Sequence, residues 1–163
     1  MFGFLPRGRL TGGERNFICA VVSIGAFAGV LAIDVVGGLA ADHTHLREMN
    51  FFTFWTIFVG IVGGVAGFLS SYARYFGFAG PGGWFRAFFG GIIVSGIAAV
   101  IGGTLILPYY GTMFAPMKLI IVMFEVPAFA VLWVAMVACV HMLMIEWRQE
   151  RESIFTAMPQ PLR

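Results

Sequence analysis

The sequence predicts an all-α membrane protein with four transmembrane helices, and three observations support this fold class. Of its 163 residues, 60% are hydrophobic and only 11% are charged, a composition far too apolar for a soluble domain. Four long apolar windows carry almost no charge, and about 20 apolar residues are enough to cross the hydrocarbon core of a bilayer. Short polar segments separate these windows. The chain, residues 1–163, is therefore expected to form a single polytopic membrane domain.

The four spans use nearly the whole chain. We expect them at residues 17–41, 51–72, 85–107 and 119–145, with short tails at residues 1–16 and 146–163. The arginines before the first span suggest a signal peptide. However, the apolar run that follows is too long for one and no small-residue cleavage motif closes it. The first apolar segment is therefore expected to stay attached as the first membrane helix.

The distribution of basic residues predicts the orientation of the spans. Eight of the ten Lys and Arg residues lie in the two tails and in the connection between spans 2 and 3; only Arg47 and Lys118 lie in the other two connections. Positive charge accumulates on the cytoplasmic side of membrane proteins, so both termini are expected in the cytoplasm. Arginine outnumbers lysine nine to one, a ratio typical of GC-rich bacterial genomes, which favours a bacterial inner membrane.

Small residues predict where the helices pack closely. Without a hydrophobic driving force between them, membrane helices associate where small side chains let backbones approach. These residues are Gly25 and Gly29 in span 1, Gly60, Gly63, Gly64 and Gly67 in span 2, and Gly91, Ser95, Ala99 and Gly103 in span 3. We expect the faces of spans 2 and 3 to meet. Two interpretations stay open: dense GxxxG-type packing within one bundle, or faces that partner subunits cover.

Three ionisable residues lie inside the predicted spans: Asp34, Glu125 and His141. Such groups are costly in a membrane and each is a functional candidate. Glu125 stands two residues before Pro127, which is expected to kink the fourth span, and a carboxyl group beside a kink suits a proton or cation site. The alternative is a protonated Glu125 that is hydrogen-bonded between helices. Asp34 is expected near the outer interface, where it is either a second ion ligand or a solvated residue.

Histidines supply the remaining site candidates. The connection between spans 1 and 2 contains Asp42, His43 and His45, and imidazole with carboxylate suits zinc or copper. So short a motif is also typical of a solvated polar turn. His141, close to Met142 and Met144, is a candidate single ligand for a pigment or haem, although a hydrogen-bonded histidine fits the position as well.

Several function classes are excluded by what the chain leaves outside the membrane. Tails and loops this short hold no soluble catalytic domain, nucleotide site or nucleic-acid module. No Ser/His/Asp constellation is visible, so no enzymatic activity is expected. The glycine-rich segment 77–83 follows a membrane helix and lacks the lysine of a phosphate loop, which indicates a connector. Membrane lipids are expected to bind, and no other cofactor is predicted.

Three functions are compatible with these features. The favoured one is a non-catalytic accessory or assembly subunit of a larger inner-membrane complex, such as a respiratory or photosynthetic one, bound to other membrane subunits or to copies of itself. The second is a transporter or channel subunit with a proton or cation site at Glu125. The third is a metal or redox membrane protein that uses His43 and His45.

Overall fold

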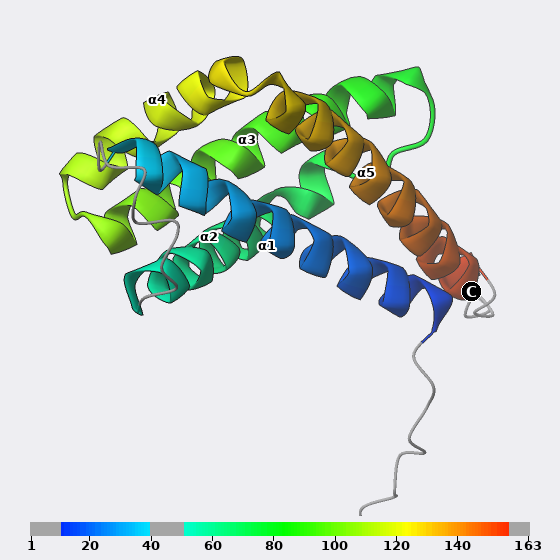
Figure 1. The fold of residues 1–163 in the computed structure, drawn as a ribbon. Helices are drawn as coiled ribbons and strands as arrows, with labels where there is room; N and C mark the ends of the chain where they lie inside the picture. Colours follow the sequence, from blue (N-terminus) through cyan, green and yellow to red (C-terminus); the bar gives the residue numbers. More distant parts are fainter. Residues whose placement is uncertain (1–10, 40–50, 157–163) are drawn as a thin grey trace, which may run out of the picture.

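The computed structural model describes residues 11–39 and 51–156, and all regular secondary structure in them is helical. The helices are α1 (Gly12–Leu39), α2 (Phe51–Tyr75), α3 (Pro81–Ile106), α4 (Tyr110–Glu125) and α5 (Pro127–Thr156). Figure 1 shows α1 and α2 side by side, with α3 behind them, α4 along the top of the view and α5 returning to the start of α1. The predicted fold class is confirmed.

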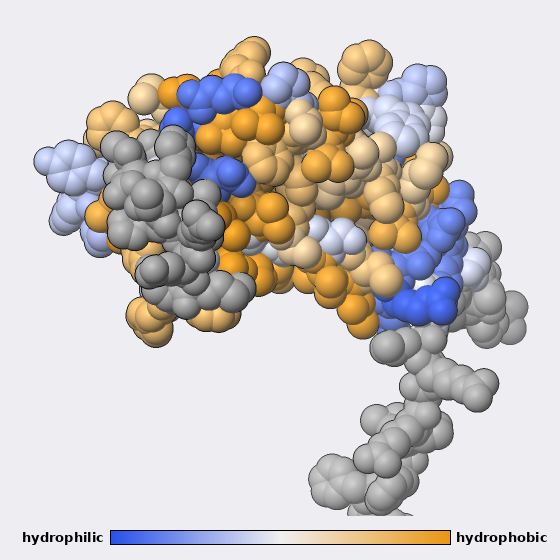
Figure 2. Space-filling view, in the orientation of Figure 1, coloured by the Kyte–Doolittle hydropathy of each residue, from blue (hydrophilic) through white to orange (hydrophobic). Residues whose placement is uncertain are grey.

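Four of the described helices, α1, α2, α3 and α5, are long and apolar enough to cross a membrane. α4 has 16 residues, fewer than the roughly 20 that span a bilayer. The chain is therefore a multi-pass membrane protein with one additional short helix. Figure 2 shows a broad hydrophobic band between hydrophilic patches at the two ends of the visible face.

The fourth span differs from the prediction. A continuous helix over residues 119–145 is wrong, because α4 ends at Glu125 and α5 begins at Pro127. Val126 between them has φ −123° and ψ 84°, outside the helical region. Proline lacks an N–H, its ring clashes with the preceding helical turn, and it disfavours helical backbone in the residue before it. The membrane-spanning window accordingly lies at Pro127–Ser153.

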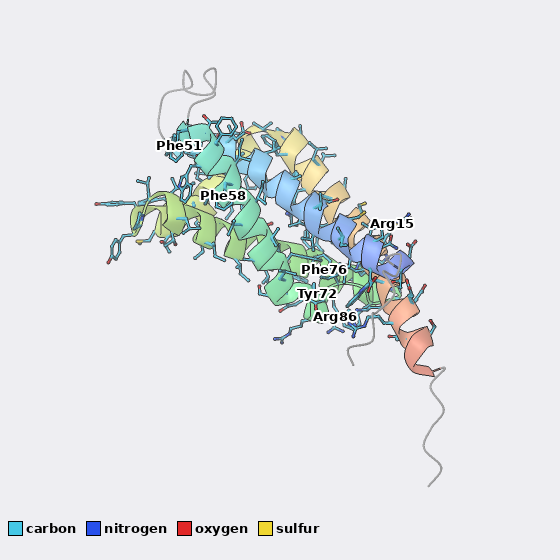
Figure 3. All side chains as sticks on the ribbon, turned by 90° about the horizontal axis from the view of Figure 1, so that it is seen from below. Arg15, Phe51, Phe58, Tyr72, Phe76 and Arg86 are labelled. Atoms are coloured by element: carbon cyan, nitrogen blue, oxygen red, sulfur yellow. The ribbon has the colours of Figure 1, made fainter. Side chains whose placement is uncertain are left out.

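Basic residues gather at one end of the bundle, which we call the arginine end. It comprises the start of α1, the end of α2, the start of α3 and the end of α5, and Figure 3 shows Arg15 and Arg86 there with Phe51 at the opposite end. All arginines of the described residues belong to it: Arg15, Arg74, Arg86, Arg148 and Arg151. Lys118 on α4 is the described basic residue that lies outside this group.

An aromatic cluster fills the core near the arginine end. Phe17 of α1 lies 5.3 Å from Tyr72 of α2 and 5.4 Å from Trp147 of α5, measured between ring centroids. Phe68 lies 5.6 Å from Phe76, and both rings are buried. Aromatic pairs at these separations add about 0.5–1.5 kcal/mol each beyond their burial. The cluster joins three helices that are distant in the sequence.

Two polar contacts close the same junction between α1 and α5. The side-chain amide of Asn16 donates a hydrogen bond to the Glu146 carboxylate at 2.6 Å. The backbone N–H of Gly13 donates to the Glu150 carboxylate. The first N–H groups of a helix have no partner within the helix, so a carboxylate there satisfies one of them and interacts favourably with the helix dipole. Glu150 of α5 therefore caps the start of α1, and Glu146 holds the Asn16 side chain beside it.

The glycines of α2 lie at two different interfaces. A Cβ on Gly60 would lie 2.6 Å from the Ala32 Cβ, and one on Gly64 would lie 2.5 Å from the Ala28 Cβ, both in α1. A Cβ on Gly63 would lie 2.7 Å from the Ala98 carbonyl oxygen of α3. A Cβ on Gly67 would likewise lie 2.7 Å from the Val94 carbonyl oxygen of α3. On the α1 side, Gly25 and Gly29 lie against Ile57, Ile61 and Val65 of α2.

The glycines Gly63 and Gly67 of α2 meet α3 beside the small residues predicted for span 3, and not along them. α2 packs on Val94 and Ala98, whereas the small residues predicted for α3 point to other helices. Gly91 faces Trp133 and Val137 of α5, and Gly103 faces Gly111 of α4. At about 100° per residue, the mean direction of the predicted small residues of α3 is turned roughly 100° from that of Val94 and Ala98. α3 therefore packs against α2 on one side and against α4 and α5 on another.

Candidate functional site

A partly open cavity of about 90 Å³ lies in the half of the bundle away from the arginine end. All five helices contribute to its lining, with Met136 from α5 and Leu119 from α4 among the larger side chains. Its small lining residues are Ala28, Ala32, Gly60, Gly64, Ala98, Ala99, Gly102, Gly103, Gly111 and Ala115. Small side chains leave room between helices. Five of the residues predicted for helix contact also line this cavity: Gly60, Gly64, Ser95, Ala99 and Gly103.

The lining is apolar, with Ser95 as its one hydroxyl residue. The Ser95 hydroxyl accepts a hydrogen bond of 2.9 Å from the indole N–H of Trp133. This bond joins α3 to α5 and satisfies the polar group that Trp133 would otherwise bury. The cavity therefore offers hydrophobic contact and little hydrogen bonding to a ligand.

Glu125 lies at the last residue of α4, beside the break that precedes Pro127. Its carboxylate forms an ion pair with the Lys118 ammonium at 3.4 Å, and the Glu125 side chain is 59% exposed. The sequence analysis placed Glu125 inside the fourth span. In the structure it is instead the last residue of the short helix α4, and its side chain faces outward.

Asp34 lies in the last third of α1 and is partly buried. Its neighbours Val35 and Val36 line the cavity, whereas Asp34 does not. Asp34 therefore lies toward the end of the bundle opposite the arginine end. The described residues contain no group of three or more His, Cys, Asp or Glu side chains that could hold a metal ion.

His141 is buried inside α5, with no exposed surface. Its Nδ1 accepts a hydrogen bond from the Gly77 N–H at 3.3 Å, and the Trp84 ring packs edge-on at 4.8 Å. Within the described residues its Nε2 has no hydrogen-bond partner. The imidazole therefore anchors the connection between α2 and α3, and a pigment or haem could reach it only if the surrounding helices moved.

Two arginines, Arg86 of α3 and Arg148 of α5, hold the end of α2 and the start of the same connection. Arg148 donates to the Ala73 carbonyl at 2.5 Å and Arg86 donates to the Arg74 carbonyl at 3.3 Å. Both guanidinium groups also lie over the Phe78 ring, at 4.0 Å and 4.1 Å. The last carbonyls of a helix lack intrahelical partners and attract cations. The arginines therefore cap α2 and hold Phe78 against the bundle.

The metal-site candidates of the sequence analysis do not belong to the sites described above. Asp42, His43 and His45 fall outside the described residues. The sequence analysis missed Gly111 and Ala115, whose small-xxx-small spacing follows the third span and could have indicated close packing of α4 on α3.

Comparisons of the chain with protein-family models, with curated proteins and with solved structures gave no match. Function must therefore be inferred from the residues and geometry above.

Proposed function

We propose that this protein is a non-catalytic accessory or assembly subunit of a larger complex, respiratory or photosynthetic, in a bacterial inner membrane. In this proposal both termini lie in the cytoplasm, because the described arginines gather at one end of the bundle. Glycine-mediated contacts hold the subunit itself together. The observation that carries the proposal is the outward surface of α4.

α4 contacts the bundle through a narrow stripe and exposes the rest of its circumference. Its buried residues are Gly111, Ala115 and Val122. Its large exposed hydrophobic residues are Tyr110, Met113, Phe114, Met117, Ile120, Ile121 and Phe124. Methionine and aromatic residues are enriched at protein interfaces, where flexible thioethers and large rings fit a partner surface. A short helix with such a surface is suited to docking another membrane subunit.

Two of the helices that contact α4, namely α3 and α5, also have much uncovered surface. Only 22% of the apolar window of α3 and of α5 is buried, against 33% for α1 and 39% for α2. Both α3 and α5 contact α4. A partner that covers α4 would therefore find further apolar surface beside it, which supports an interface on this side of the bundle.

Site-specific photo-crosslinking in native membranes tests this proposal. A benzophenone amino acid at Met117, which is 53% exposed on α4, should yield adducts with a different polypeptide. The matched control is Val22 on α1, which is 62% exposed and lies away from α4; it should yield none. Absence of polypeptide adducts at Met117, or adducts only with a second copy of the chain, would refute the subunit proposal.

Glu125→Gln separates the accessory function from a transporter or channel that uses this carboxyl group. The Glu125 side chain is 59% exposed and its ion pair is with Lys118, so we expect a loss of less than about 1 kcal/mol of stability. The variant should assemble and support full activity of the complex. Lys118→Met is the matched control for the ion pair. A Gln variant that assembles but abolishes ion-dependent activity, while Lys118→Met retains it, would favour the transporter.

A further inference from the structure

We propose that Arg86 is the centre of a binding site for the phosphate of an anionic phospholipid headgroup, with Arg74 and Arg148 beside it. The site lies at the arginine end, where the start of α3 meets the end of α2. This inference does not depend on the accessory function. It follows from how the guanidinium groups are held, from the few carboxylates near them and from the aromatic side chains around Arg86.

The guanidinium groups of Arg86 and Arg148 are held close together by Phe78. Their Cζ atoms lie 4.1 Å and 4.0 Å from the centroid of this ring, so the two cations are at most about 8 Å apart. Each also donates a hydrogen bond to a carbonyl at the end of α2, that of Arg74 or of Ala73. These contacts fix the two side chains before a ligand binds, which lowers the entropic cost of binding.

Few carboxylates balance the positive charge on this side of the bundle. Residues 51–124, which include α2, α3 and their connection, contain no Asp or Glu. Of the four carboxylates of the described arginine end, Glu152 interacts electrostatically with Arg148. The other three are engaged at the start of α1: Glu14, Glu146 and Glu150. Cations within the Debye length of about 8 Å repel one another and are only partly screened by salt, so a bound anion would relieve their repulsion.

Arg86 has donors that fit a phosphate. A guanidinium group carries five N–H donors in a planar fork that matches the oxygens of a phosphate. Within the described part of the chain, Arg86 forms one hydrogen bond, to the Arg74 carbonyl, and its side chain is exposed. The remaining N–H groups can therefore bind two phosphate oxygens. Arg74 is exposed as well and adds a third positive charge beside this position.

The surroundings of Arg86 favour a lipid over a free phosphate. Trp84, Phe85 and Phe89 lie in the first turns of α3 and are 42%, 70% and 59% exposed. Exposed aromatic side chains at the end of a membrane helix are typical of the headgroup level of a bilayer. α3 is long and apolar enough to cross the membrane. A phospholipid whose phosphate binds Arg86 would therefore lay its acyl chains along the apolar surface of this helix.

Native mass spectrometry of the full chain, released from mild detergent micelles, measures this binding. With equal amounts of dioleoylphosphatidylglycerol and dioleoylphosphatidylcholine, the wild-type chain should retain at least about three times more of the anionic lipid. Arg86→Gln removes both the charge and the fork, and should reduce the retained phosphatidylglycerol at least about fivefold. Arg15→Gln is the matched control, because Arg15 is also an exposed arginine of this end but lies away from Arg86 (Figure 3). It should retain the wild-type amount.

Two further arms keep the test decisive. Arg74→Gln is the second variant if Arg86→Gln loses its helical circular dichroism, and should reduce retention at least about twofold. Inorganic phosphate in excess over the lipid distinguishes the two sources of the phosphate group, and the lipid should stay bound.

Three results would overturn the proposal. The first is equal retention of the two lipids by the wild-type chain. The second is retention by the folded arginine variant of the site that equals retention by Arg15→Gln. The third is displacement of phosphatidylglycerol by inorganic phosphate, which would assign these arginines to a free anion.

Discussion

Replacing Gly77 with alanine should destabilise the protein by about 2–5 kcal/mol, because two costs add at this position. Gly77 has φ +81°, a conformation that costs a residue with a Cβ about 1–2 kcal/mol. An added Cβ would also lie 2.6 Å from the Met144 carbonyl oxygen and 2.8 Å from the Arg148 side chain. Overpacking of this kind costs about 1–3 kcal/mol more. The midpoint of SDS-induced unfolding in mixed micelles, followed by helical circular dichroism, measures the loss.

Gly80 is the matched control for this prediction, since it has nearly the same backbone conformation without the crowding. Its φ is +88°, and a Cβ there meets no atom within 4 Å. Gly80→Ala should therefore lose only the conformational cost of about 1–2 kcal/mol. Equal losses in the two variants would show that the crowding of the added Cβ against Met144 and Arg148 of α5 adds no cost.

Much of the fold is predictable because hydropathy reports the thickness of the bilayer. The windows over residues 17–41, 51–72 and 85–107 overlap α1, α2 and α3. The helices begin or end several residues outside these windows, since backbone hydrogen bonding continues past the hydrocarbon whereas hydropathy does not. Residues 110–125 are apolar on nearly all sides. Hydropathy therefore could not distinguish this short helix from part of a span, and only Pro127 indicated where the helix ends.

The candidate site was less predictable, because it depends on how five helices are turned about their axes. Gly60 and Gly63 are adjacent on the predicted stripe, yet they face α1 and α3 respectively. A cavity forms where small residues from several helices fail to fill the space between them, and no single helix sequence encodes that gap. His141 depends on Gly77, which is 64 residues earlier, so its hydrogen bond had no local signal.

Replacing Gly111 with leucine should separate α4 from α3, and we expect a loss of at least about 3 kcal/mol. The backbones of Gly103 and Gly111 touch, and a Cβ on either residue would collide with the carbonyl group of the other. Backbone atoms cannot rotate away as a flexible side chain can, so the cost should reach or exceed the upper end of the 1–3 kcal/mol typical of overpacked sites. The higher helix propensity of leucine returns only about 1 kcal/mol.

The same variant connects the packing of α4 to its proposed role. If α4 is the docking surface, Gly111→Leu should also abolish the polypeptide adducts formed by the photo-crosslinker at Met117. Gly96→Leu adds the same side chain to α3 where it meets no atom within 4 Å, so it should retain both stability and adducts. A folded Gly111→Leu protein that retains the Met117 adducts would show that the partner does not need α4 held against α3. α4 would then contact the partner independently of its packing on α3.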